Sequence, residues 1–218
     1  MSNDAFSPEA VVTVPLVADG APALWEALAA VGRRLTGDVR VVIVRGEGAD
    51  FFYDTTADPA PPPPGAIAWL RRPDLVAIAA IRGRANGAGL DVALACDLRI
   101  ATDDAELAVA AGAGGARFES ALETVARLGD LVGAARALEL ALTGRHVSGL
   151  EAATIGLVNQ ATPPDQLDHA VDAAVATLVR RSRASATQIK ALLAAPDADR
   201  RRRTDELVAG ITLAVSES

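Results

Sequence analysis

Residues 78–101, IAAIRGRANGAGLDVALACDLRIA, hold the strongest structural signal in this sequence. An apolar run leads into a turn with Gly83, Gly87 and Gly89, and a predicted helix follows with Asp91 in its first turn. A strand, small residues and then a helix place unpaired N–H groups at a helix N-terminus, where the helix dipole favours negative charge. Glycine and alanine also let a ligand approach that backbone closely. On spacing alone, a tight turn that serves only local packing explains the same residues.

Apolar runs upstream of this turn predict a parallel sheet. Residues 10–18 and 39–46 have the pattern of strands, and residues 21–37 between them have the pattern of an amphipathic helix that ends at Gly37. Strand, helix and strand at this spacing form a parallel crossover. Four consecutive prolines, residues 61–64, exclude a regular helix or interior strand from the next connection.

The rest of the chain alternates short strands with helices. Two short strands are expected within residues 98–109, and another at 157–163. Elsewhere the 3.6-residue period predicts helices, with breaks at Gly129, Gly133 and Gly144. This order of elements predicts an α/β fold.

Composition argues against several classes of function. The 28 acidic and 21 basic residues give a net charge of −7, and only 3% of residues are aromatic, so nucleic acid is not expected as a partner. The single cysteine, Cys96, excludes an internal disulfide and favours a cytoplasmic protein. No uncharged apolar stretch has the length of a membrane span. His146 and His169 have no companions at metal-ligand spacing, so no metal site is expected.

Two segments carry a family resemblance. Residues 73–107 contain an apolar strand, the glycine turn and the sequence ACDLRIA, and residues 142–167 read LTGRHVSGLEAATIGLVNQATPPDQL. In this order and separation, both are similar to signature segments of the crotonase superfamily, the enoyl-CoA hydratase/isomerase family. The resemblance implies a crotonase (ClpP-like) α/β fold of repeated ββα units with C-terminal helices. We expect a core domain over residues 1–165 and a helical oligomerisation region over 166–218.

The resemblance also implies a site for an acyl-CoA thioester, with no separate cofactor. In that family, two backbone N–H groups hold the carbonyl oxygen of the thioester. By position, one donor here is Ala88, between Gly87 and Gly89, and the other is Thr55, close to Tyr53 in the loop after the second strand. The small residues of the turn are then expected to clear the approach to the thioester oxygen.

Carboxylates are the candidate acid/base groups. The resemblance places Asp91 on the first of the two glutamates that family hydratases use, whereas the second falls within residues 108–116, AVAAGAGGA, which contain no carboxylate. Glu119 and Glu123, on the next predicted helix, are candidates to replace it. The alternatives are a first-turn acid favoured by the helix dipole for Asp91, and solvated helix charges for the two glutamates.

Two functions stay open from the sequence. The first is a hydratase/isomerase-like enzyme, a lyase or isomerase, that acts on an acyl-CoA through an oxyanion hole and one carboxylate. Isomerisation or decarboxylation suits one carboxylate better than hydration does. The second is a non-catalytic acyl-CoA-binding or accessory homologue of a polyketide or acyl-CoA pathway, with a protein partner. Both predict no nucleic-acid or membrane partner. The family implies a homotrimer or homohexamer, and the apolar residues 207–215 suit such burial.

Overall fold

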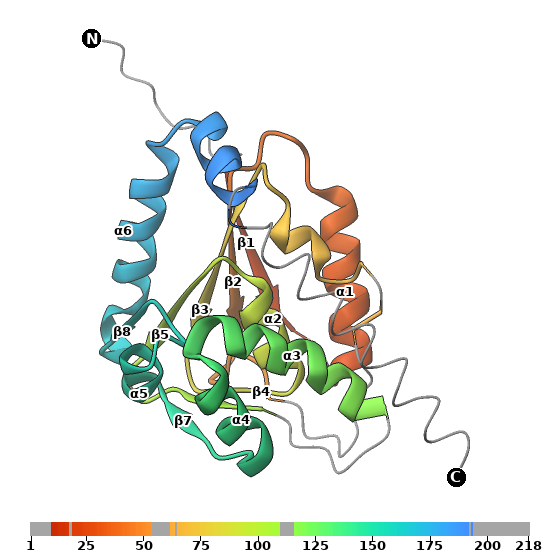
Figure 1. Ribbon diagram of the computed structural model, residues 1–218. Coiled ribbons are helices and arrows are strands. Elements are labelled where there is room, and N and C mark those ends of the chain that lie inside the picture. Colours follow the sequence, from red (N-terminus) through yellow and green to blue (C-terminus); the bar gives the residue numbers. More distant parts are fainter. Residues whose placement is uncertain are drawn as a thin grey trace.

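The computed structural model describes residues 10–17, 19–53, 62–63, 65–109, 116–191 and 193, with the backbone alone described for 116–123. Its centre is a five-stranded sheet in the order β1-β2-β3-β5-β8, and every neighbouring pair is parallel (Figure 1). The strands are β1 (Val11–Leu16), β2 (Val41–Gly46), β3 (Val76–Ile81), β5 (Leu98–Thr102) and β8 (Gln160–Thr162). The predicted parallel crossover from the first strand to the second is confirmed.

A second, three-stranded sheet has the order β4-β6-β7. Its strands are β4 (Arg84–Asn86), β6 (Glu106–Ala108) and β7 (Val147–Ser148), with β4 parallel and β7 antiparallel to β6. The same unit occurs two times: a strand of the large sheet, a strand of the small sheet and then a helix. The two copies are β3-β4-α2 and β5-β6-α3. The α/β class and the expected ββα units are therefore present.

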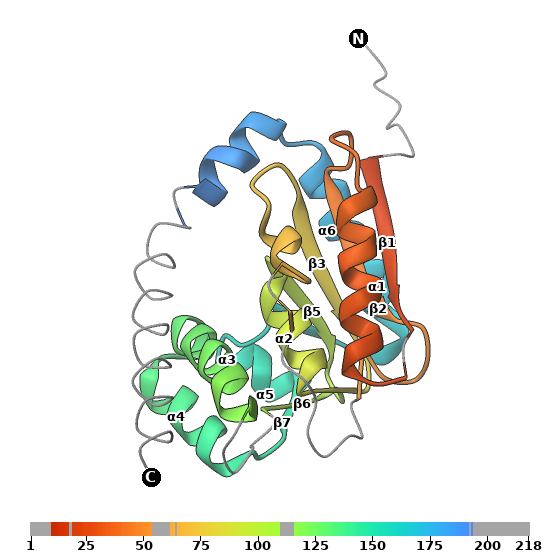
Figure 2. The ribbon, with the colours of Figure 1, turned by 90° about the vertical axis from the view of Figure 1, so that its right-hand side faces the viewer.

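Helices enclose the two sheets (Figures 1 and 2). They are α1 (Ala21–Arg34), α2 (Ala88–Ala95), α3 (Ala116–Val132), α4 (Ala134–Thr143), α5 (Gly149–Thr154) and α6 (Leu167–Val179), with the 3₁₀ turns η2 (Ala68–Arg71) and η3 (Pro164–Gln166). A further helical segment covers residues 183–191. Within the described ranges, no helix combines the length and the apolar character needed to cross a membrane.

The inner strands β2 and β3 of the large sheet are buried on both faces, and side-chain alternation decides which core each of their residues joins. In β2, Val42 and Val44 face α1 and α2, whereas Val41 and Ile43 face α6. Strand β3 divides in the same way, with Ile78 on the α6 side. Figure 1 shows α1 and α6 on opposite sides of this sheet. The apolar runs of β2 and β3 are continuous because both faces of these strands are covered, whereas Thr13 and Pro15 of the edge strand β1 are exposed.

Both tryptophans of the chain lie in the layer formed by α1 and η2. Trp25 of α1 is 2% exposed and Trp69 of η2 is 8% exposed, and the Trp69 indole donates to the carbonyl of Ala66 at 3.0 Å. A Cβ on Gly32 would lie 2.4 Å from Cδ1 of Trp69, so α1 has a glycine where the indole packs against its backbone.

Two helix boundaries differ from the sequence expectations. Helix α1 ends at Arg34 and not at Gly37. Helix α3 continues through Gly129, so the break predicted there is wrong, whereas the breaks at Gly133 and Gly144 are confirmed. A glycine inside a helix costs about 1 kcal/mol relative to alanine, which tertiary packing readily offsets. Gly133 and Gly144 instead have φ values of 80° and 59°, which end a helix.

Candidate functional site

The glycine turn closes against a segment of the chain itself. A Cβ on Gly83 would lie 2.3 Å from the carbonyl oxygen of Ala49, and one on Gly89 would lie 2.3 Å from that of Phe52. Gly87 has φ 49°, which favours glycine. Protein carbonyls lie where a Cβ on Gly83 or Gly89 would stand, so these two glycines let the chain pack closely on itself, and their part in clearing the approach to a thioester oxygen stays a prediction.

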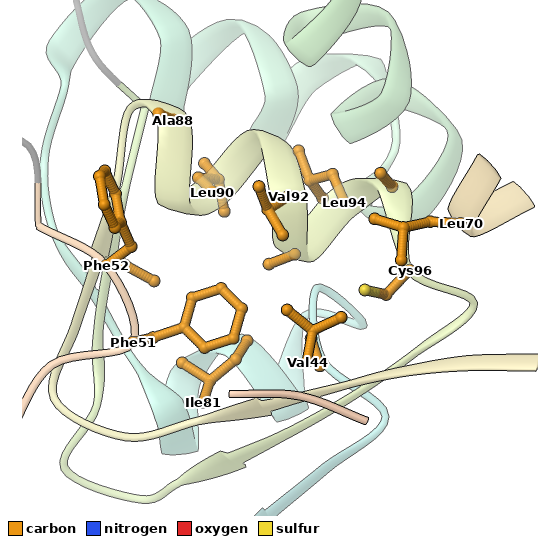
Figure 3. Close-up of a cluster of buried hydrophobic side chains, with 14 of the residues drawn as sticks. Val44, Phe51, Phe52, Leu70, Ile81, Ala88, Leu90, Val92, Leu94 and Cys96 are labelled. Carbon is orange, nitrogen blue, oxygen red and sulfur yellow. The ribbon is translucent and has the colours of Figure 1, made fainter. Parts of the chain in front are cut away.

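The closing segment is held by the small sheet. The Phe52 amide donates to the Arg84 carbonyl at 3.1 Å, and the Asn86 amide donates to the Phe52 carbonyl at 3.3 Å. These bonds extend the sheet by one bridge, between Phe52 and Ala85. Figure 3 shows the Phe52 ring beside Ala88, at the N-terminal end of α2. The loop predicted to supply one oxyanion donor therefore reaches the helix that carries the other.

Helix α2 is buried almost all around. Leu90, Val92 and Leu94 are each at most 2% exposed, and Figure 3 shows this helix above Phe51 and Ile81. A helix that is apolar on every side belongs in a core. Asp91 is its only polar side chain, and it is half-buried. A lone carboxylate in this setting is a candidate for function.

The first turn of α2 leaves a backbone donor available. Asp91 N donates to the Gly87 carbonyl at 3.0 Å, which begins the helical ladder. Within the described ranges, no backbone carbonyl accepts a hydrogen bond from Ala88 N, and Gly87 provides no side-chain cap. Ala88 is 2% exposed, so its amide lies in a water-poor setting at the positive end of the helix.

Asp91 is anchored by the next helix. The Thr124 hydroxyl of α3 donates to Asp91 Oδ1. One turn further along both helices, Arg127 Nε donates to the Leu94 carbonyl at 3.3 Å. Thr124 was not among the residues predicted from sequence, because only the packing of α3 on α2 brings it to Asp91.

Tyr53 forms part of a polar cluster at the edge of this region. The Arg84 guanidinium lies 3.8 Å from the centroid of the Tyr53 ring, and Tyr53 is 38% exposed. Asp50 accepts from Arg84 Nε at 3.0 Å and from Nη2 at 2.6 Å. The side-chain hydrogen bonds from Arg84 hold the pKa of the Asp50 carboxyl below its usual value.

The other predicted site residues are only partly described. Thr55 lies outside the described residues, and so do the side chains of Glu119 and Glu123, although both positions belong to α3. Their roles stay predictions. The N-terminal end of α2 holds the four others, next to the segment that ends at Tyr53: Gly87, Ala88, Gly89 and Asp91.

The Cys-Asp pair after α2 is structural. Burial raises the pKa of the Cys96 thiol to about 12, which keeps it unreactive at neutral pH. Asp97 Oδ2 accepts from Ala77 N and from Lys190 Nζ, both at 2.8 Å. Asp97 therefore holds backbone, and it also ties the helical segment 183–191 to the large sheet.

Arg99, two residues later, serves the backbone as well. It is 2% exposed and donates to the carbonyls of Leu157 at 2.9 Å and Cys96 at 2.8 Å. Burial lowers its pKa to about 10, so the guanidinium stays charged at neutral pH. Asp97 and Arg99 thus stabilise the framework of the fold. Asp91, by contrast, lies near the N-terminal end of α2.

Comparisons with known proteins agree with this geometry. A model of the enoyl-CoA hydratase/isomerase family matches residues 67–213, more than half of the chain. The fold and the match together define an α/β protein of the crotonase superfamily. The chain belongs to the enoyl-CoA hydratase/isomerase family.

Solved structures resemble the chain over most of its length. A candidate enoyl-CoA hydratase from Thermobifida fusca YX in complex with CoA is 34% identical, with a TM-score of 0.71 over 93% of this chain and 91% of that one. The acetoacetyl-CoA complex, also 34% identical, has a TM-score of 0.67, covering 88% of this chain and 85% of that one. A monofunctional enoyl-CoA isomerase from M. smegmatis is 33% identical, with a TM-score of 0.72 over 84% and 87% of the two chains.

Among curated sequences, the peroxisomal Δ(3,5)-Δ(2,4)-dienoyl-CoA isomerase of Arabidopsis thaliana is 37% identical over 136 residues, which are 59% of this chain and 45% of that protein. The chain spans 34% and 41% of the length of two further relatives that it matches. The family is therefore established, and the reaction of this chain is a matter for proposal.

Proposed function

We propose that this chain binds an acyl-CoA thioester and transfers a proton next to its carbonyl group. Ala88 N–H is one donor to the carbonyl oxygen, and the Thr55 amide is the second. Asp91 is the group that takes and returns the proton. The observation that carries the proposal is the Ala88 amide, which is buried at the positive end of α2 and donates to no backbone carbonyl of the described residues, one helical turn from the only carboxylate of that helix.

The chemistry follows from charge. Removing a proton from the carbon beside a thioester moves negative charge onto the carbonyl oxygen. Backbone donors that already point at that oxygen stabilise this charge most in a water-poor site, because they need no reorganisation. Helical side chains tilt toward the N-terminus, which directs the Asp91 carboxylate to the same end of α2 as Ala88 N–H.

One carboxylate suits isomerisation better than hydration. Moving a double bond along an enoyl chain needs one group that removes a proton from one carbon and returns it to another. Adding water needs a proton taken from water and a proton given to carbon, and residues 108–116 offer no second carboxylate. We therefore propose a 3-enoyl-CoA to 2-enoyl-CoA shift as the first reaction to test. The complexes of the Thermobifida protein with CoA and with acetoacetyl-CoA support the choice of ligand.

The test uses short enoyl-CoA thioesters. Conversion of 3-hexenoyl-CoA to 2-hexenoyl-CoA and hydration of crotonyl-CoA are followed by enone absorbance, for wild type and for Asp91→Asn. Loss of a positioned acid/base group lowers kcat by about 10²- to 10⁴-fold. Asp172→Asn, an exposed carboxylate on α6, is the matched control and should keep wild-type activity. Turnover by Asp91→Asn at the wild-type rate would refute the assigned role.

A non-catalytic acyl-CoA-binding protein is the second candidate. The absence of a carboxylate from residues 108–116 favours it. Calorimetric titration with acetoacetyl-CoA separates the two, because binding without turnover of any enoyl-CoA supports the second candidate. The trimeric or hexameric assembly and the cytoplasmic location stay predictions, which sedimentation and fractionation would test.

A further inference from the structure

Asp91 needs a partner that fixes the direction of its carboxylate. The other seven residues of α2 are buried and apolar, so the helix itself offers no side-chain donor to orient this group. An aspartate side chain can rotate about two bonds, and a base that faces the wrong way does not reach the substrate proton. Its orientation must therefore come from another element.

Thr124 supplies that partner from α3. It is 8% exposed, and its hydroxyl donates to Asp91 Oδ1. Threonine is branched at Cβ, which restricts χ1, so a buried threonine presents its hydroxyl in a defined direction. The carboxylate oxygen that accepts this hydrogen bond is thereby held toward α3, which restricts the rotation of the Asp91 side chain.

The position of Thr124 is itself fixed by the packing of α3 on α2. Leu128, one turn further along α3, is fully buried in the core that includes Leu90 and Leu94. Arg127 Nε donates to the Leu94 carbonyl at 3.3 Å. Thr124 thus contacts Asp91, and Arg127 contacts Leu94. The two contacts are three residues apart on each helix, so they lie along the same pair of facing helix surfaces.

We propose that Thr124 is a positioning residue, which acts by holding the Asp91 carboxylate toward the N-terminal end of α2. This inference rests on the proposed function, because it assigns Thr124 a share in the same proton transfer. Thr124 contacts Asp91 through its hydroxyl, so a positioning role predicts that its loss lowers the rate of the chemical step and leaves KM unchanged.

The experiment compares Thr124→Val, which removes the hydroxyl with little change in shape, with Thr124→Ser, which keeps it. Exchange of the α-proton of 3-hexenoyl-CoA in deuterium oxide and steady-state isomerisation are measured for both. We expect Thr124→Val to lower kcat and the exchange rate about 10-fold, the value of one hydrogen bond, with KM unchanged. Thr124→Ser should stay within about 3-fold of wild type, since it can make the same bond.

The matched control is the same substitution at another buried threonine. Thr102 of β5 is fully buried, and its hydroxyl has no hydrogen-bond partner within the described part of the chain. Thr102→Val should leave kcat and KM at their wild-type values. Urea unfolding of each variant establishes that the protein assayed is folded.

Each outcome decides the point. Wild-type kcat in Thr124→Val would overturn the positioning role while leaving the proposed function intact. Equal losses in the valine and serine variants would overturn it too, because they would indicate a packing role. Absence of both exchange and turnover in the wild-type protein would overturn the proposed function and this inference with it.

Discussion

Replacing Gly89 by alanine tests how closely the loop before Tyr53 packs on α2. A Cβ at this position would lie 2.3 Å from the Phe52 carbonyl oxygen and 3.1 Å from the Phe52 Cβ. The first contact is with backbone, which cannot rotate out of the way. To restore an ordinary contact, the N-terminus of α2 and the Phe52 carbonyl must separate by about 1 Å, a displacement that can cost about 10²-fold in rate at a catalytic site.

We therefore expect Gly89→Ala to lower both stability and turnover. Overpacking a core contact costs about 1–3 kcal/mol, which exceeds the gain of about 1 kcal/mol from alanine in a helix. The same displacement moves Ala88 N–H relative to the loop that holds the second proposed donor. Urea unfolding gives the stability, and enoyl-CoA turnover gives the rate.

Gly129→Ala is the control. It introduces the same methyl group into helix α3, where the new Cβ would meet no atom of the described residues within 4 Å beyond its chain neighbours and the backbone of its own helix. This variant should gain up to about 1 kcal/mol in stability, with an unchanged rate. A Gly89→Ala protein with wild-type stability and rate would refute the close packing of Phe52 on α2. Lost stability with a wild-type rate would show that the glycine serves packing alone.

Two further predictions concern the framework. Asp97→Ala removes the acceptor of the Ala77 amide and the carboxylate paired with Lys190, whose ammonium keeps the Leu75 carbonyl as an acceptor. The free energy of unfolding, measured in urea, should therefore fall by about 2–3 kcal/mol, and by less in Asp97→Asn; an unchanged value would contradict the role of this contact. Arg84 holds the pKa of Asp50 below its usual value, so this pair stabilises the folded chain above the unfolded pKa of 3.8, and the contribution is lost as the pH falls through the lower folded value. The stability difference between wild type and Asp50→Asn should therefore be present at about pH 6 and diminish below about pH 4, and a difference that is constant with pH would refute this linkage.

Long apolar runs made the large sheet predictable. The strands β1, β2 and β3 each hold six residues, enough for the apolar pattern and the flanking turns to indicate a strand. The strands β4 and β7 have three and two residues, too few for any periodicity, and neither was predicted. Both depend on partners far away in sequence, since β4 pairs with β6 and β6 with β7.

The site was predictable where its residues lie in one continuous stretch. Ala88 and Asp91 share the glycine turn and its helix, so local spacing and the family resemblance place them together. Thr124 is 33 residues from Asp91, and an isolated threonine on an amphipathic helix carries no signal of a partner. The close packing at Gly83 could not be predicted for the same reason, because the carbonyl beside it belongs to Ala49, on a distant loop.

The placement of the two indoles in one layer determines what intrinsic fluorescence can report. Trp25 and Trp69 both lie in the layer of α1 and η2, and both are nearly excluded from water. Emission will therefore change when that layer loosens, and it will say little about a rearrangement confined to α3. A spectroscopic titration with a thioester needs a probe introduced near Thr124, because an unchanged native signal would not exclude occupancy.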